Sequence, residues 1–120
     1  ILFRRMILEV FLERKDPKHH EALMLVRNFL MQLHPGIQEN LKWGLPMYSI
    51  KKNIAYLDVQ KGRPLVGINY AYEIPEMKEL LHFGSRTRIG HFYLDSIYED
   101  RMAKLLTVME IAVSHDLNRN

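Results

Sequence analysis

The chain has 120 residues, of which 48% are hydrophobic and 26% charged, and this composition is that of one ordinary globular domain spanning residues 1–120. It contains no cysteine, which excludes disulfides, thiol nucleophiles and thiolate metal sites and suits a reducing, cytoplasmic location. No apolar run approaches the roughly 18 residues of a membrane span, and the net charge of +3 comes from basic residues interleaved with acidic ones, so we expect neither a membrane protein nor a dedicated nucleic-acid binder.

The first third of the sequence predicts helices. Apolar residues at positions 7, 8, 11 and 12 indicate a short helix ending near Lys15. Asp16-Pro17 then provides a favoured N-cap followed by a favoured first helical residue. The apolar stripe of the second helix comprises Leu23, Val26, Leu30 and Leu33, and His34-Pro35-Gly36 ends it. We expect residues 37–41 to form one further turn of helix.

The middle of the chain predicts an antiparallel meander of three strands. Residues 54–59 alternate in the manner of a strand, with Ala55, Leu57 and Val59 facing a core. Residues 66–70 repeat this pattern after the turn at 61–64, and residues 47–50 pair with the first strand across Lys51-Lys52-Asn53.

The last third alternates helix, loop, strand and helix. Pro75 opens a short helix, residues 83–88 form a loop, and residues 89–94 form one or two strands. Ser96 and Glu99 have the spacing of a capping box, and the helix that follows runs to about Ser114. These elements predict an α+β, two-layer sandwich in which helices pack on one face of an antiparallel sheet.

The motif Trp43-Gly44-x-Pro46-x-Tyr48, with the flanking helices, resembles the YdhG-like family, a bacterial group of domains of unknown function. The resemblance covers residues 10–113 and implies the element order α-β-β-β-α-β-β-α. Because the family includes a frataxin-like iron chaperone, it also implies iron as a cofactor. Hard cations prefer carboxylate ligands, however, and this chain is net basic with no block of adjacent acids, so the residues give the iron role no support.

Two segments are candidate binding sites. Trp43, Pro46 and Tyr48 would form a rigid recognition surface; the alternative is that Trp43 fills the gap between helix and sheet. In the segment 84–91, Arg86 and Arg88 could bind an anion, with His91 beside them on a strand. The alternative is a solvated basic loop and a structural histidine.

The second face of the predicted sheet is unusually apolar. Ile54 and Tyr56 lie opposite the core face of one strand, and Leu65 and Gly67 do so on its neighbour. We therefore expect this face to be covered by a second copy of the protein, a partner, or the segment Ile1–Leu12.

These observations predict a non-catalytic binding or adaptor domain that self-associates through the sheet face around Tyr56. The first alternative is an iron-delivery protein, and the second is an enzyme or small-anion binder centred on residues 84–91.

Overall fold

The computed structural model describes residues 7–96 and 99–120. Its helical elements are α1 (Ile7–Leu12), the 3₁₀ helix η1 (Pro17–His19), α2 (His20–Met31), η2 (Ala71–Glu73), α3 (Met77–Leu80) and α4 (Glu99–Leu117). Its strands are β1 (Gln38–Lys42), β2 (Leu45–Ser49), β3 (Asn53–Gln60), β4 (Arg63–Ile68) and β5 (Gly90–Tyr93).

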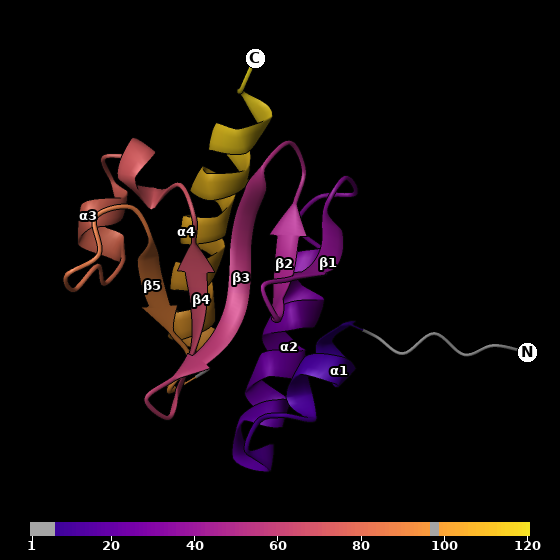
Figure 1. Ribbon diagram of the computed structural model, residues 1–120. Coiled ribbons are helices and arrows are strands. Elements are labelled where there is room, and N and C mark those ends of the chain that lie inside the picture. Colours follow the sequence, from indigo (N-terminus) through magenta and orange to yellow (C-terminus); the bar gives the residue numbers. More distant parts are fainter. Residues whose placement is uncertain (1–6, 97–98) are drawn as a thin grey trace, which may run out of the picture.

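The five strands form one antiparallel sheet in the order β1-β2-β3-β4-β5. Figure 1 shows α2 and α4 behind this sheet, with α3 beside the edge strand β5, so no long helix within residues 7–96 and 99–120 covers the opposite face of the sheet. The main core lies between the sheet and these helices, and it includes Leu23 of α2, Leu57 of β3 and Leu105 of α4. The predicted α+β sandwich is confirmed.

The central strands pair in the predicted antiparallel order. Met47 lies opposite Tyr56, and Leu57 lies opposite Val66. This alternation sends Ala55 and Leu57 into the main core and leaves Tyr56 on the other face. The residues between these core positions therefore form the second face of the sheet, opposite the helices.

The prediction for residues 37–41 is wrong, because Gln38–Lys42 forms the edge strand β1 rather than a turn of helix. Its sequence, Gln-Glu-Asn-Leu-Lys, has little strand propensity, but it pairs with β2 along its whole length, from Gln38 opposite Ser49 to Lys42 opposite Leu45. Pairing with a neighbouring strand overrides a weak local preference here. Four strands consequently precede α3 and one follows it.

The prediction for Ile54 is also wrong, because this side chain packs into the main core rather than on the second face. The β2–β3 register passes from Tyr48 opposite Ala55 to Ser49 opposite Asn53, which leaves Ile54 as the additional residue of a β-bulge. A bulge turns its extra side chain out of the regular alternation.

Residues 7–12 of the N-terminal segment pack into the main core through Leu8, Phe11 and Leu12, so this part of it does not cover the second face. The final helix reaches Leu117, three residues beyond its predicted end. The residues between Ser96 and Glu99 of the predicted capping box, 97 and 98, lie outside the described residues, as do residues 1–6. Every helix within 7–96 and 99–120 is too short or too polar to span a bilayer.

Candidate functional site: an aromatic and basic groove

The β1–β2 hairpin places Trp43 where its backbone has an unfavourable conformation and its large apolar side chain is exposed to solvent. Trp43 and Gly44 form the turn between the strands, with φ of 53° and 76°. Positive φ at both central residues is the type I′ arrangement, which favours Asn-Gly, whereas a bulky residue there costs about 1–2 kcal/mol. The Trp43 side chain is nevertheless 81% exposed, so the expectation that it fills a gap between helix and sheet is wrong.

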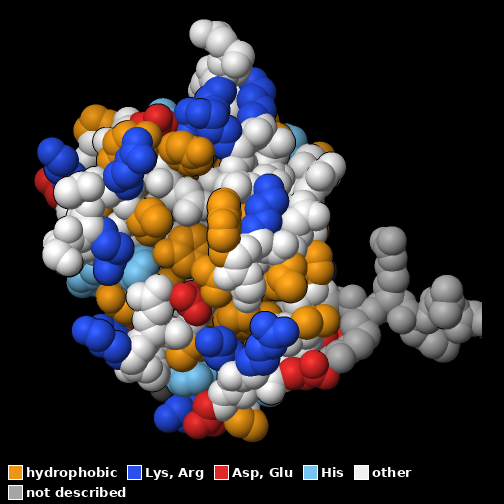
Figure 2. All heavy atoms as spheres, viewed as in Figure 1, with side chains coloured by type: hydrophobic (Ala, Val, Ile, Leu, Met, Phe, Trp, Pro, Cys, Tyr) orange, Lys and Arg blue, Asp and Glu red, His pale blue; other side chains and the backbone are white. Residues whose placement is uncertain are grey.

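Trp43 forms one wall of an open groove of about 430 Å³. The other lining residues come from the β2–β3 turn, the start of β3, the segment after β4 that includes η2, and the loop before β5: Lys52, Asn53, Asn69, Tyr70, Tyr72, Arg88 and Ile89. Figure 2 shows hydrophobic side chains gathered over the middle of the open sheet face, with Lys and Arg side chains around them. We call this cavity the aromatic groove.

The charged groups of the aromatic groove are all basic, since its lining contains Lys52 and Arg88 but no carboxylate. The Lys52 ammonium lies 5.1 Å from the centre of the Tyr70 ring, and the Arg88 guanidinium lies 4.9 Å from that of Tyr72. Both are cation–π contacts, which hold the cation over the ring without neutralising its charge. The groove therefore combines exposed aromatic surface with two available positive charges.

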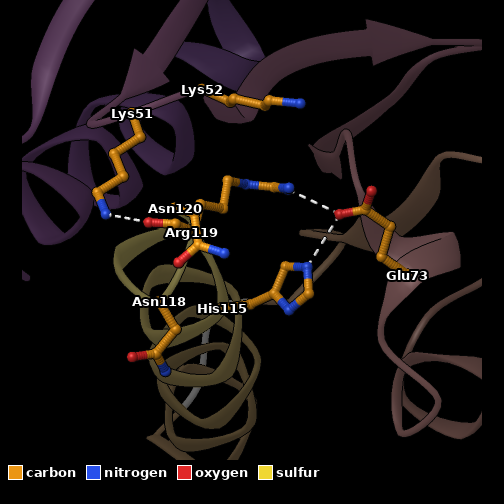
Figure 3. Close-up of a pocket in the computed structure, with 7 residues that line it drawn as sticks. All are labelled: Lys51, Lys52, Glu73, His115, Asn118, Arg119 and Asn120. Atoms are coloured by element: carbon orange, nitrogen blue, oxygen red, sulfur yellow. Dashed lines mark hydrogen bonds and ion pairs between the residues drawn. The ribbon is translucent and has the colours of Figure 1, made fainter.

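A larger neighbouring cavity, of about 840 Å³, has a different electrostatic character. Lys52 borders both cavities, and Figure 3 draws no hydrogen bond or ion pair between Lys52 and the group around Glu73. That carboxylate accepts hydrogen bonds from the His115 ring at 2.9 Å and from Arg119 at 2.8 Å, and these bonds hold the pKa of Glu73 below its usual value. Lys51 bonds the carbonyls of Leu117 and Arg119. The basic groups of this cavity are thus mainly occupied in holding the end of α4.

Two residues of the predicted recognition motif point away from the groove. Pro46 and Tyr48 are buried in β2, and the Tyr48 hydroxyl donates to Glu39 at 2.8 Å. Arg27 of α2 contacts the same carboxylate through Nε and Nη2, at 2.9 and 3.0 Å. Burial, followed by the nearby Glu39 charge, raises the pKa of Tyr48. Tyr48 therefore connects β2 to α2 through β1, and of Trp43, Pro46 and Tyr48 only Trp43 faces solvent.

Tyr56 and His91 form a buried pair on the second sheet face. Tyr56 is 6% exposed, His91 is 1% exposed, and a 3.1 Å hydrogen bond joins the tyrosine hydroxyl to Nε2 of the histidine. The Tyr56 ring crosses Gly67, the intervening residue on β4: a Cβ there would lie 2.1 Å from ring atom Cζ. Burial lowers the pKa of His91 to about 4, and its Nδ1 has no partner within the described residues. The protein's own residues thus cover this part of the face.

Arg86 and Arg88 do not form one site. Arg86 closes its own loop, donating from Nε to the Ile89 carbonyl at 3.2 Å and from Nη2 to the His82 carbonyl at 2.9 Å. Arg88 instead lines the aromatic groove, where its Nη2 donates to the Tyr72 hydroxyl at 3.4 Å. Within the segment 84–91, Arg86 therefore stabilises its own loop, Arg88 lines the groove and His91 is buried.

Sequence reasoning identified Trp43 and Arg88 but not Lys52, Tyr70 or Tyr72, which complete the groove. The available signal was the pair of tyrosines in Tyr70-Ala71-Tyr72, directly after β4. Three His, Asp or Glu side chains placed to hold a metal ion are not found anywhere in residues 7–96 and 99–120.

No family model matches the sequence, and neither does any curated protein. Among solved structures, the chain is similar to YdhG of Bacillus subtilis, a protein from the DUF1801 family, with a TM-score of 0.64 and 15% identity over 93% of each chain. At this identity, the likeness shows a shared fold.

Proposed function

We propose that this chain is a YdhG-like, non-catalytic binding domain that holds a small anionic molecule in the aromatic groove. The fold shared with a DUF1801 protein supports the kinship, and the groove supports the binding role. The cysteine-free composition favours the cytoplasm as its place of action.

The observation that carries this proposal is the strained backbone and the exposed side chain of Trp43. Its backbone adopts a conformation that Asn or Gly would adopt at lower cost, and its side chain, 81% exposed, gains little from burial. Strained residues of this kind concentrate at functional sites, because there the strain is compensated by binding rather than by folding. A ligand that covers the indole would supply the missing burial.

The charges of the groove select the class of ligand. Lys52 and Arg88 are exposed, and neither forms an ion pair within the described part of the chain. Other arginines do have carboxylate partners, such as Arg27 with Glu39 and Arg63 with Asp95. Two cations beside a cavity without carboxylates favour an anion.

A binding role is better supported than catalysis. General acid–base chemistry most often uses a His, Asp or Glu within hydrogen-bond reach of the ligand, and the groove lining contains none of these three. His91 is buried beneath Tyr56, and burial lowers its pKa to about 4, below the near-neutral value that suits general acid–base catalysis.

The other predicted functions have weaker support. The iron-delivery alternative lacks a carboxylate or histidine cluster in the described chain, and Glu73 is already bonded to His115 and Arg119. Self-association through the sheet face around Tyr56 stays a prediction. A substitution of Tyr56 would not test it, because Tyr56 is covered within its own chain and the substitution would disturb folding.

The test is a two-dimensional ¹H–¹⁵N NMR titration that follows the indole N–H of Trp43, which is the sole tryptophan of the chain. The panel contains phosphate, pyrophosphate, citrate and nucleotides. We expect at least one anion to shift the indole resonance and the Lys52 and Arg88 amides saturably, and Arg88→Gln to weaken the effect about tenfold. Lys104→Gln, which removes an exposed cation of α4, is the matched control. If no anion of the panel moves these resonances, the proposal is wrong.

A further inference from the structure

We infer that the ligand of the aromatic groove is a mononucleotide, a molecule that joins a phosphate to a flat heteroaromatic ring. This inference rests on the proposed function, and it adds the chemical class of the ligand. It follows from the way in which the groove combines three kinds of surface: aromatic faces, unpaired cations and side-chain amides.

The aromatic surface is available to a ring. Trp43 is 81% exposed and Tyr72 is 43% exposed, and they are the two most exposed aromatic side chains among the large exposed hydrophobic residues of the described chain. Both line the same cavity, Trp43 from the β1–β2 turn and Tyr72 from η2. A nucleobase gains binding energy by stacking on an aromatic side chain, and every base has a face that can do so. An inorganic anion would leave this surface unused.

The cationic surface suits a phosphate. Of the donors of the Arg88 guanidinium, Nη2 reaches the Tyr72 hydroxyl at 3.4 Å, and the others have no hydrogen-bond partner within the described residues. A guanidinium can present two parallel N–H groups to a phosphate, and charge-assisted bonds of this kind are about twice as strong as neutral ones. Lys52 lies on the same cavity as a second positive charge. A neutral aromatic ligand would leave both cations unpaired.

The amide surface suits the edge of a base. Asn69 uses its nitrogen to donate to the Asn53 carbonyl at 3.0 Å, and the Asn53 side-chain oxygen accepts from Lys42 at 2.9 Å. These bonds fix both side chains while leaving the Asn69 side-chain oxygen as an acceptor and the Asn53 side-chain nitrogen as a donor. Base edges carry donors and acceptors that side-chain amides can pair with. The groove could therefore hold a base by its edge as well as by its face.

The dimensions favour a single nucleotide over a strand. A volume of about 430 Å³ lies within the range of small-molecule sites, which runs from about 300 to 1,000 Å³. A single-stranded nucleic acid would need basic residues continuing along its backbone, but the adjacent cavity directs Arg119 and His115 to Glu73. We therefore assign the site to one nucleotide.

The experiment uses the fluorescence of Trp43, which as the sole tryptophan reports directly on the groove. Indole emission is titrated with the four ribonucleoside monophosphates and, as fragments, with adenosine, ribose 5-phosphate and inorganic phosphate. We expect saturable quenching by at least one monophosphate, with a Kd at least tenfold below that of each fragment. Arg88→Gln should raise that Kd about tenfold, Tyr72→Leu should raise it about three- to tenfold, and Lys104→Gln should not change it.

Each remaining outcome counts against the inference. If every monophosphate binds no more tightly than ribose 5-phosphate, the base contributes nothing to binding and the inference is wrong. In that case, anions that shift the Trp43 indole resonance in the NMR titration would leave the proposed function intact. If oligonucleotides bind more than tenfold tighter than monophosphates, the site is for a strand and the mononucleotide assignment is overturned. If neither the nucleotides nor the anion panel affect Trp43, the inference and the proposed function fail together.

Discussion

Replacing Gly67 by alanine should destabilise the protein through a residue on the neighbouring strand. Gly67 lies opposite Tyr56 in the β3–β4 pair, and His91 lies opposite Gly67 on β5. The Tyr56 ring passes over the glycine to reach that histidine. The glycine is therefore needed for space, and not for an unusual backbone conformation.

The size of the effect follows from the contacts. An added Cβ would lie 2.1 Å from Cζ and 2.5 Å from the hydroxyl oxygen of Tyr56, so the ring must move by about 1.3 Å to reach ordinary van der Waals contact at 3.4 Å. Overpacking of this kind costs about 1–3 kcal/mol, and losing the buried bond to His91 costs about 1–3 kcal/mol more. Alanine regains about 0.4–1 kcal/mol by restricting the unfolded chain. We expect a net loss of about 1–5 kcal/mol in the free energy of unfolding.

A double-mutant cycle in urea isolates the contact. Tyr56→Ala alone removes a buried ring and should cost about 3–5 kcal/mol. In that background Gly67→Ala should be neutral or stabilising, by up to about 1 kcal/mol, because the clash no longer exists. If Gly67→Ala is equally harmless in the wild-type protein, Tyr56 does not lie across the glycine and the description of this face is wrong.

Two further predictions concern buried polar groups. Because burial lowers the pKa of His91 to about 4 from an ordinary 6.5, the folded state keeps His91 neutral while the unfolded chain binds a proton as the pH falls below 6.5. The contribution of His91 to the free energy of unfolding should therefore decline as the pH falls from 6.5 to 4, by up to about 1.4 kcal/mol per pH unit. The stability of His91→Gln, measured by urea unfolding, should lack this decline. Parallel pH profiles for the wild-type protein and the variant would contradict the prediction. The Asp116 carboxylate accepts the backbone N–H groups of Lys51 at 2.7 Å and Lys52 at 3.1 Å, so Asp116→Asn, which turns a donor towards them, should cost about 1–3 kcal/mol. Glu110→Gln on the exposed side of the same helix is the control, and equal stability of the two variants would show that Asp116 does not hold the β2–β3 turn.

Most of the fold could be predicted because long apolar patterns dominate it. The apolar residues of α2 recur with the period of a helix, and those of β3 and β4 alternate with the period of a strand. Each pattern therefore fits only one type of element. The edge strand β1 has no such pattern, since its burial is irregular and its stability comes from pairing with β2. The bulge at Ile54 depends in the same way on the register of two strands, which one strand's sequence does not contain.

The candidate site was less predictable because it depends on the direction in which each side chain points. Trp43 and Tyr48 are five positions apart in one motif, yet the first faces solvent and the second faces the core. Sequence alone indicated that the second sheet face is apolar, but not that Tyr56 would cross Gly67 and seal against His91. Tyr72 and Arg88 are brought together by the loops that flank α3 and β5, and no local pattern encodes that contact.

In the proposed function Trp43 serves ligand binding rather than folding, and the variant Trp43→Asn separates these two roles. Lys61→Asn is a matched control, because Lys61-Gly62 forms the β3–β4 turn with φ of 51° and 73°. Since asparagine tolerates this conformation well, both variants should match or exceed the wild-type free energy of unfolding, by up to about 1 kcal/mol. We expect Trp43→Asn alone to lose nucleotide binding, measured by isothermal titration calorimetry. A loss of stability in Trp43→Asn, or unchanged nucleotide binding by it, would show that Trp43 does not have this role.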